Sequence, residues 1–399
     1  MTDRSNPRDA AGIGGGAAAP LIAHVSADYP DAVQPAKTRV IAALVEGTAD
    51  AFRHRVYSIN RAGGASGWRT PGRIEPVADD GRLASWRYAA PARGLLLGTA
   101  MRRLADGVAD DLAARGLAPA AIHAHKLSVE GLAAHRLAAR LGVPYLLTLQ
   151  GNSDQKIVGA RRDLHAAYRR VWHEAAAVIA FAPWIARWCE RRFGARAGPV
   201  VTLPCIPASE RTIAPRATPP TIGTAFHLAH WRNKNIATLA RAAGLSRAGA
   251  LEVAGGGDAA SEAAVDRALR QAGVQGIARR IGALEPAALQ QWMNGCAAFA
   301  LPSRRESFGL VFVEALLAGC PIVYPRGAAV DGWFDDCPFA IGVDARDPRA
   351  VAEGMNMLIL ENDARKQALA EWQRSGAAAR FGREAILAGY RDTLARVLR

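Results

Sequence analysis

The sequence predicts an α/β protein made of two doubly wound domains, each a parallel β-sheet covered by helices. Short apolar runs alternate with alanine-rich amphipathic stretches along most of the chain, which is typical of repeated strand–helix units. With 399 residues, the chain exceeds the size at which a single hydrophobic core usually stops growing. The alternation is interrupted by a proline-rich stretch at residues 204–220 and then starts again. We therefore expect two domains joined by a linker.

The first domain is expected over residues 20–205, and the segment 1–19 before it is predicted to be a disordered tail rich in glycine and alanine. Helical stretches are predicted at Arg39–His54, Thr99–Arg115 and Gly131–Leu141. Six strands are predicted: Leu21–Val25, Val56–Ile59, Ala121–His125, Pro144–Leu149, Ala177–Phe181 and Val200–Leu203.

The linker is expected at residues 206–220 and the second domain at residues 221–382, followed by a last amphipathic helix within 383–399. Four strands are predicted in this half: Thr221–Phe226, Leu251–Ala254, Ala297–Leu301 and Pro321–Tyr324. Ligands of doubly wound domains bind at the carboxyl ends of the strands, so the site is expected there.

The segment Ser303–Tyr324 combines features that point to a ligand site. Gly309 is predicted to open a short helix and Gly319 to end it in the left-handed conformation. The helix is apolar on every side, which is typical of a buried helix, yet it carries Glu314 at its centre. A buried carboxylate is costly unless it is satisfied. Glu314 therefore either pairs with a buried arginine or accepts hydrogen bonds from the hydroxyl groups of a ligand.

The start of this helix is a predicted anion site. The first backbone N–H groups of a helix have no acceptor within it, and the helix dipole adds partial positive charge. A second carboxylate, Glu306, lies in the loop just before them. A sugar nucleotide presents the matching groups, namely a ribose diol, a diphosphate and sugar hydroxyls.

The pattern P-S-x-x-E-S-F-G-L-V-x-x-E-A-L-x-x-G-x-P, over residues 302–321, resembles the E-x7-E signature of retaining glycosyltransferases of family 4. The resemblance implies the GT-B fold, in which two Rossmann-like domains face each other across a cleft and the last helix crosses back to the first domain. It implies that Glu314 holds the ribose of the donor nucleotide and that Glu306 contacts the donor sugar. It also implies that four backbone amides meet the sugar hydroxyls and the diphosphate, those of Ser307, Phe308, Gly309 and Leu310.

A lysine after the first strand of the second domain is predicted to bind the diphosphate. Lys234-Asn235 resembles the lysine end of the family segment V-G-R-L-x-x-x-K-N, and a positive charge at such a turn stabilises a leaving diphosphate. The arginine of that segment is not matched. Either Arg232 or His227 substitutes for it, or the second charge is missing. A solvated surface lysine is the alternative interpretation of Lys234.

The glycines after the second strand of this domain, Gly255 to Gly257, formally fit a dinucleotide-binding turn. That reading needs an acidic residue about 20 positions later, and the segment Arg279–Gly282 contains none. Gly255 and Gly257 fit better as a tight strand-to-helix turn that lets the backbone approach the donor, as the G-x-G turn of the family does.

The resemblance also assigns positions in the first domain. Gln150 stands where many members carry a histidine near the donor sugar, and a glutamine can orient a hydroxyl but cannot act as a base. Asn152 and Asp154 are predicted to bind sugar hydroxyls or to cap the next helix. Lys37, with Thr38, is assigned to a loop near the donor phosphate and the acceptor, and an ordinary helix start is the alternative.

His123 and His125 alternate along one predicted strand, so both side chains project from the same face of the sheet. A metal site would need a third ligand, which the sequence does not indicate, and at least one of the two histidines is expected to be packed and hydrogen-bonded. The resemblance places this strand end, with His125 and Lys126, near the acceptor cleft. No D-x-D motif occurs, and we predict neither a metal nor a cofactor, because the nucleoside diphosphate sugar is a substrate.

The charge distribution indicates where partners bind. The net charge is +14, and residues 1–205 hold 27 Lys and Arg against 17 Asp and Glu. Such a basic half suits an anionic membrane surface or a lipid-diphosphate acceptor, while a solvated arginine-rich surface is the alternative.

Five cysteines without C-x-x-C spacing indicate reduced thiols and a cytoplasmic protein. No apolar run is long enough to span a bilayer, so any membrane contact is expected to be peripheral, at the inner face of the cytoplasmic membrane.

We therefore predict a glycosyltransferase that moves a sugar from a nucleoside diphosphate sugar to a hydroxyl acceptor. The acceptor would be a sugar, a lipid-linked oligosaccharide or a growing bacterial polysaccharide, and the family implies retention of configuration. A sugar-nucleotide epimerase of the same fold is the nearest alternative. A non-enzymatic basic protein that binds membrane or nucleic acid is the second, and no nucleic-acid motif supports it, so nucleic acid is not an expected partner.

Overall fold

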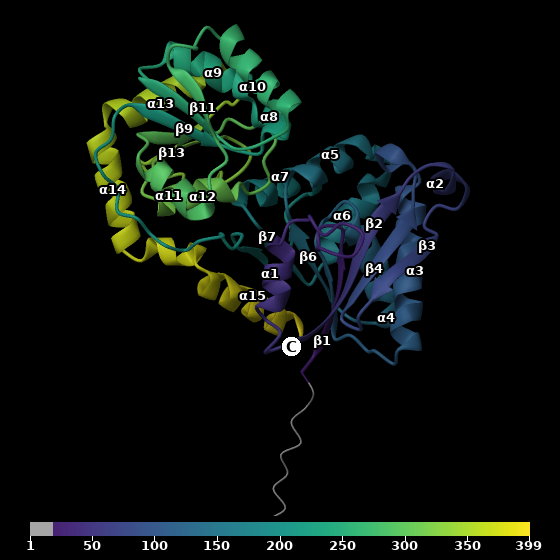
Figure 1. Cartoon of the computed structure of the whole chain (residues 1–399). Helices are drawn as coiled ribbons and strands as arrows, with labels where there is room; N and C mark the ends of the chain where they lie inside the picture. Colours follow the sequence, from purple (N-terminus) through teal and green to yellow (C-terminus); the bar gives the residue numbers. More distant parts are fainter. Residues whose placement is uncertain (1–18) are drawn as a thin grey trace, which may run out of the picture.

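The computed structural model describes residues 19–399, which form two α/β domains one above the other in Figure 1. The predicted disordered tail, residues 1–19, therefore lies outside the described residues except for its last position. The fold class predicted from the alternating pattern is confirmed.

The first domain contains an eight-stranded sheet in the order β3-β4-β2-β1-β5-β6-β7-β8, in which β3 alone pairs antiparallel, with β4. Apolar strands buried in such a sheet need helices on both faces. The strands are β1 (Leu21–Ser26), β2 (Arg53–Ala62), β3 (Ile74–Asp79), β4 (Leu83–Ala89), β5 (Ala121–Ala124), β6 (Tyr145–Leu149), β7 (Ala177–Ala180) and β8 (Val200–Thr202). The helices are α1 (Val40–Glu46), α2 (Ala65–Arg69), α3 (Leu97–Ala114), α4 (Glu130–Leu141), α5 (Asn152–Ala160), α6 (His165–Glu174) and α7 (Pro183–Phe193).

The second domain contains a six-stranded, fully parallel sheet in the order β11-β10-β9-β12-β13-β14. Its strands are β9 (Thr221–Ala225), β10 (Ala250–Ala254), β11 (Ala278–Gly282), β12 (Ala298–Ala300), β13 (Ile322–Pro325) and β14 (Ala340–Val343). The helices are α8 (Trp231–Lys234), α9 (Ile236–Leu245), α10 (Ala259–Gln271), α11 (Pro286–Asn294), α12 (Leu310–Leu317) and α13 (Pro348–Leu360).

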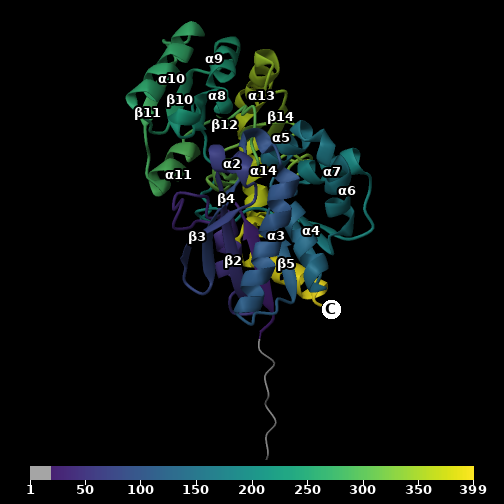
Figure 2. The ribbon, with the colours of Figure 1, turned by 90° about the vertical axis from the view of Figure 1, so that its right-hand side faces the viewer.

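The chain then returns to the first domain through α14 (Asn362–Arg374) and α15 (Arg383–Val397). The C-terminus lies next to the first domain in both Figure 1 and Figure 2. Contacts with that domain fix α15: the Tyr390 hydroxyl lies 2.9 Å from His123 Nδ1, and Arg391 pairs with Asp50 at 2.9 Å. The last helix therefore belongs structurally to the first domain, although it follows the second in sequence.

The predicted helix Arg39–His54 is wrong at its C-terminal end. The helix stops at Glu46, and β2 starts at Arg53. A Cβ on Gly47 would lie 2.6 Å from the side chain of Leu387, so the returning helix α15 passes directly over this point. His54 is buried in the sheet instead of lying on a helix.

Four strands, β3, β4, β11 and β14, were not predicted. Five of the six residues of β3 are exposed, so this edge strand lacks the apolar run that identifies a buried strand. β14 is only four residues long, and two of them are half-buried. Both strands lie at the outer edges of their sheets.

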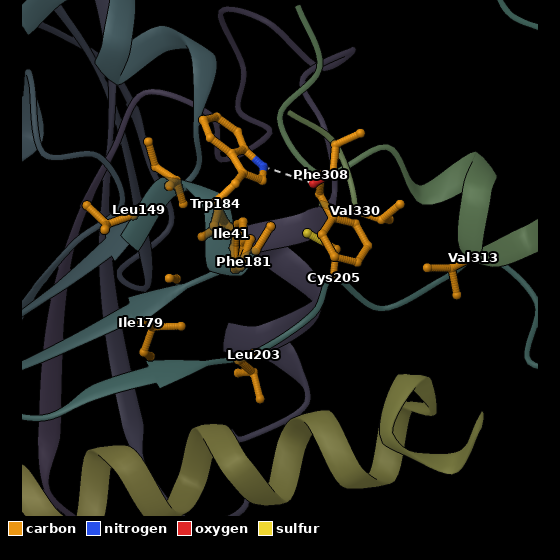
Figure 3. Packing of buried hydrophobic residues seen from close by; sticks show 14 of the residues in the cluster. Ile41, Leu149, Ile179, Phe181, Trp184, Leu203, Cys205, Phe308, Val313 and Val330 are labelled. Carbon is orange, nitrogen blue, oxygen red and sulfur yellow. Dashed lines mark hydrogen bonds between the residues drawn. The ribbon is translucent and has the colours of Figure 1, made fainter. Parts of the chain in front are cut away.

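Two tryptophan side chains join the two domains. The Trp184 indole N–H donates to the Ala329 carbonyl oxygen at 2.9 Å, and the Trp333 indole N–H donates to the Phe181 carbonyl oxygen at 3.0 Å. Figure 3 shows Trp184, on the first domain, beside Phe308 and Val330 of the second. These contacts hold the two halves of the site in register.

All five cysteines are free thiols, and four of them are buried. Within residues 19–399, no helix is both long enough and apolar enough to cross a bilayer.

Candidate functional site

A cavity of about 530 Å³ lies between the domains, where the carboxyl ends of the two parallel sheets face each other. This is the position at which doubly wound domains bind ligands. The first half of the chain contributes Asp28, Thr38, Val40, Lys126, Gln150, Ser153, Phe181 and Cys205. The second half contributes Ala225, Phe226, His227, His230, Lys234, Glu306, Ser307, Phe308, Gly309, Leu310 and Val311.

The N-terminus of α12 supplies free backbone donors on this wall. Gly309 precedes the helix with φ 73°, and a Cβ there would lie 2.8 Å from the Phe312 ring, so the turn requires glycine. The first amide of the turn with an acceptor is that of Phe312, which donates to the Gly309 carbonyl oxygen at 3.0 Å. Within the described chain, the amides of residues 308–311 have no acceptor. They remain available to an anion, as the sequence predicts.

Lys234 and Glu306 form an ion pair beside these donors, and Ser303 Oγ donates to the same carboxylate oxygen at 3.4 Å. Both side chains are mostly covered, with 19% and 16% of their surface exposed. The turn is fixed by Asn235, whose side-chain amide donates to the carbonyl oxygens of Pro302 (3.1 Å) and Ala345 (2.7 Å). The fold thus brings together two predicted residues that lie 72 positions apart.

Glu314 lies in the middle of α12, half-buried, and does not line the cavity. Burial raises the pKa of its carboxyl group, and only the Ala208 amide opposes this effect. Within residues 19–399, no arginine or lysine pairs with it, so the structural alternative of a buried ion pair is not found.

The wall contributed by the first domain is built around Lys126. Its ammonium group pairs with Asp28 at 2.6 Å. The carboxyl of the fully buried Glu130 accepts the Ala27 amide at 2.8 Å, and burial raises its pKa to about 7. Burial alone would lower the pKa of Lys126, but the carboxylates of Glu130 and Asp28 hold that pKa above its ordinary value. Lys126 is therefore a charged lysine whose charge is already balanced.

Gln150 lines the cavity, and its side-chain Nε2 is buried without a partner in the described chain. The next residue, Gly151, has φ 124°, and a Cβ there would lie 3.2 Å from Ser307 Cα of the other domain. Glycine therefore lets the two walls approach. Asn152 begins α5 without lining the cavity. Asp154 is buried and accepts the Ser128 amide at 2.8 Å, and burial raises the pKa of its carboxyl.

Comparison with known proteins identifies both halves of the chain. Residues 17–205 match the family described as Glycosyl transferase 4-like domain, and residues 219–361 match Glycosyl transferases group 1. The chain belongs to the group 1 glycosyltransferases of the GT-B fold. The family predicted from the E-x7-E signature is confirmed.

Relatives of this glycosyltransferase match only in part. The D-inositol 3-phosphate glycosyltransferase of Corynebacterium kroppenstedtii is 34% identical over 96 residues, which are 24% of this chain and 21% of that protein. The protein of the same name from Xylanimonas cellulosilytica is 38% identical over 111 residues, 27% of this chain and 25% of that protein. The chain therefore aligns with about a quarter of the length of these relatives.

Solved structures match over nearly the whole chain. Sucrose-phosphate synthase from Thermosynechococcus elongatus superposes with a TM-score of 0.66 at 20% identity, covering 94% of this chain and 99% of that one. The HepE protein of Anabaena, solved in complex with UDP, superposes with a TM-score of 0.64 at 14% identity and the same coverage. These likenesses show the shared GT-B fold.

Besides Glu314, Asn152 and Asp154, further residues predicted for the site of this glycosyltransferase lie outside the cavity. The Arg232 guanidinium lies 4.4 Å from the centroid of the Trp231 ring and lines a different pocket, so His227 is the candidate left in the cleft. Lys37 is turned inward, with its ammonium 3.0 Å from both Asp31 and Ser58.

Gly255 and Gly257 also lie outside the cavity, packed against the loop after β9. A Cβ on Gly255 would lie 1.9 Å from the Phe226 carbonyl oxygen, and one on Gly257 would lie 2.9 Å from Leu228 Cβ. These glycines thus let the loop that carries His227 approach the sheet. The closest neighbours of both glycines are therefore atoms of this loop.

His125 is buried in a group of four histidines that the sequence did not predict. His24 on β1 and His54 on β2 join His123 and His125 on one face of the sheet. Ring nitrogens of His24, His123 and His125 lie within 4.8 Å of one another. His24 is therefore a third candidate metal ligand, which the sequence did not indicate. Both ring nitrogens of His24 and His123 are already hydrogen-bonded, to His125, His54, Tyr390 and Thr148. Histidines within or beside three of the apolar runs, at positions 24, 54, 123 and 125, were the signal that could have revealed this group.

Proposed function

We propose that this protein transfers a glycosyl group from a nucleoside diphosphate sugar to a hydroxyl acceptor. The observation that carries the proposal is the position of the Lys234–Glu306 pair beside the free amides of residues 308–311 in the interdomain cavity. A cation and a helix N-terminus together fit a diphosphate. The neighbouring carboxylate fits sugar hydroxyls.

The proposed step breaks the bond between the anomeric carbon and the diphosphate oxygen, which leaves with the electron pair. Lys234 and the amides of the α12 turn stabilise the charge that develops on the diphosphate. The acceptor oxygen forms the new bond to the anomeric carbon and gives its proton to an oxygen of the departing diphosphate. Gln150 orients a hydroxyl without accepting this proton, because an amide is not a base. Retention of configuration and a reaction without a resident cofactor are part of the proposal.

Glu314 is proposed to hold the ribose at the edge of the same site. Its half-buried carboxylate has no cationic partner in the described chain and lies two turns at most from the free amides. Ribose hydroxyls would satisfy it by donating hydrogen bonds. These hydrogen bonds would favour the charged form of the Glu314 carboxyl group, whose pKa is raised by burial.

The acceptor is proposed to be an uncharged sugar hydroxyl, either free or at the end of a lipid-linked oligosaccharide or polysaccharide. Four lining residues carry formal charge, and they form two pairs, Asp28 with Lys126 and Lys234 with Glu306. The first-domain wall therefore offers no free cation to a phosphorylated acceptor. A lipid-linked acceptor would place the protein at the inner face of the cytoplasmic membrane.

Donor binding tests the first part of the proposal. Thermal unfolding in the presence of UDP, GDP, ADP and TDP should show stabilisation by one of them, because a ligand at 100 times its Kd adds about 2.7 kcal/mol. Lys234→Met should weaken the binding of that nucleotide. Lys156→Met, at an exposed lysine of α5, should leave the binding unchanged. Stabilisation by none of the four nucleotides would contradict the proposal.

Turnover tests the second part. The assay mixes the sugar donor that carries the stabilising nucleotide with a panel of sugar acceptors, and it measures release of the nucleoside diphosphate. The rate of this release should fall by roughly 100-fold in Lys234→Met. Glu306→Gln should reduce turnover, and the exposed Glu371→Gln serves as its control. Incubation with the donor alone separates the alternative: formation of an isomeric sugar nucleotide would indicate an epimerase.

A further inference from the structure

A second pocket, of about 590 Å³, lies on the second domain outside the interdomain cleft. Five exposed arginines line it, and none of them lines the cleft. They come from α8, α9, the loop before Glu306 and the loop after β14: Arg232, Arg241, Arg304, Arg305 and Arg346. The remaining lining residues are uncharged, Asn233, Asn235 and Thr238. We refer to this concavity as the arginine pocket.

The charge of the arginine pocket is unbalanced. Within residues 19–399, none of the five arginines has a carboxylate oxygen within 4.0 Å. Other arginines of the same domain are paired, for example Arg279 with Glu252 and Arg280 with Asp266. Five like charges in one concavity repel one another, and an anion bound among them would relieve this repulsion.

The floor of the pocket is rigid. Asn235 is 3% exposed and adopts the left-handed conformation with φ 61°, and its amide group donates to the backbone of two neighbouring loops. The side-chain oxygen Oδ1 of Asn235 accepts a hydrogen bond from Arg304 Nε at 3.2 Å. Asn233 makes two hydrogen bonds to the loop that carries Arg304 and Arg305. Its backbone carbonyl oxygen accepts from the Arg304 backbone N–H, and its side-chain amide donates to the Arg305 backbone carbonyl oxygen. The arginines therefore project from backbone positions that are fixed relative to one another.

Guanidinium groups bind phosphate through two parallel hydrogen bonds, and several on one wall select groups with more than one negative charge. We propose that the arginine pocket binds a multiply charged phosphate group, separately from the donor site. This chemistry occurs in free polyphosphates and in the phosphomonoester headgroups of some anionic lipids, and binding measurements with the two kinds of probe distinguish these sources. The proposal does not depend on the transferase activity.

The test uses the full chain and measures binding without turnover. Lys234→Met serves as the background, so that the cation of the cleft does not contribute. Isothermal titration with inorganic tripolyphosphate should show binding that weakens as salt is added. Adding Arg304→Gln, Arg305→Gln and Arg346→Gln should weaken it about tenfold or more, which corresponds to at least about 1.4 kcal/mol. The matched control, which removes as much charge from exposed arginines of the first domain, is Arg162→Gln, Arg169→Gln and Arg170→Gln.

The second arm measures co-sedimentation with phosphatidylcholine vesicles, with and without phosphatidic acid, whose phosphomonoester headgroup carries more than one negative charge near neutral pH. Binding to tripolyphosphate alone would assign a free phosphate ligand. Binding to the anionic vesicles that is lost in the three-arginine variant would assign a lipid headgroup. The proposal is overturned if neither probe binds, or if the three-arginine variant and its control bind both probes equally. Circular dichroism confirms that each variant is folded.

Discussion

Mild acid is expected to destabilise the first domain through its four buried histidines. Burial lowers the pKa of all four rings, to about 4 for His54 and about 3 for His123, and well below 6.5 for His24 and His125. The folded state therefore holds the rings neutral, whereas the unfolded chain protonates them near their ordinary value of 6.5. Because the unfolded state then binds more protons, stability falls as the pH falls below 6.5 and is retained above it.

The expected magnitude follows from this difference in proton binding. Between about pH 7 and about pH 5.5, each ring that stays neutral in the folded state costs about 1 kcal/mol of unfolding free energy, so four rings cost on the order of 5 kcal/mol. Glu130 acts in the opposite direction. Burial raises its pKa to about 7 in the folded state, so the same change of pH increases the unfolding free energy by about 2 kcal/mol. The net loss is still a large share of the stability of a domain, which is about 5–15 kcal/mol.

A variant isolates one histidine from these other groups. His125 shares one hydrogen bond, between its Nε2 and His24, and its Nδ1 has no partner in the described chain, so His125→Gln retains the polar atom that is used. The substitution should be destabilising at about pH 7, but its cost should shrink by about 1 kcal/mol at about pH 5.5, because glutamine does not titrate. Urea unfolding, followed by circular dichroism at both pH values, measures this change.

The control is His230→Gln, at an exposed histidine of the second domain. Its effect on unfolding should not depend on pH in the way that the effect of His125→Gln does. An equal cost of His125→Gln at both pH values would refute the reasoning, because it would mean that the ring is protonated equally in the folded and unfolded states.

Two further substitutions test the packing around the site. Gly255→Ala should destabilise the second domain by more than about 2 kcal/mol in urea unfolding, because the new Cβ would lie 1.9 Å from a carbonyl oxygen at φ 136°. Gly276→Ala, where no atom lies within 4 Å of the Cβ, should be nearly neutral, and equal costs would contradict this account. Tyr390→Phe should cost about 1–3 kcal/mol because it leaves His123 Nδ1 without its hydroxyl partner. Tyr168→Phe removes a buried hydroxyl that has no partner within residues 19–399, so a comparable cost there would count against the hydrogen-bond explanation.

Most of the strands that the sequence predicted correctly are largely buried. Leu21–Ser26 and Tyr145–Leu149 are examples, since every residue in them is buried. The edge strand Ile74–Asp79 escaped prediction because its exposed positions lack the apolar run that identifies a buried strand. The helix predicted to reach His54 was too long because its end is determined by contact with α15, from the far end of the chain.

Within the site, the sequence motif anticipated the free amides of the α12 turn, because a glycine and a run of helix-forming residues define them locally. The direction of Arg232 was not predictable. His227 and Arg232 lie in one short segment, and only the path of the turn places the first in the cleft and the second in the arginine pocket. The Asp28–Lys126 pair was equally hidden, since it joins loops after two different strands.

The sequence by itself determined the fold class, the family and the glutamate–glycine turn of the donor side. These depend on apolar periodicity, and on residues close together in the chain, whose spacing is visible without coordinates. Only the tertiary structure decided which charges are paired, which arginines are left without partners, and that four histidines from three strands share one buried group. Charge and burial depend on neighbours brought together by strand order and by the returning C-terminal helix, and these contacts are not encoded in local spacing.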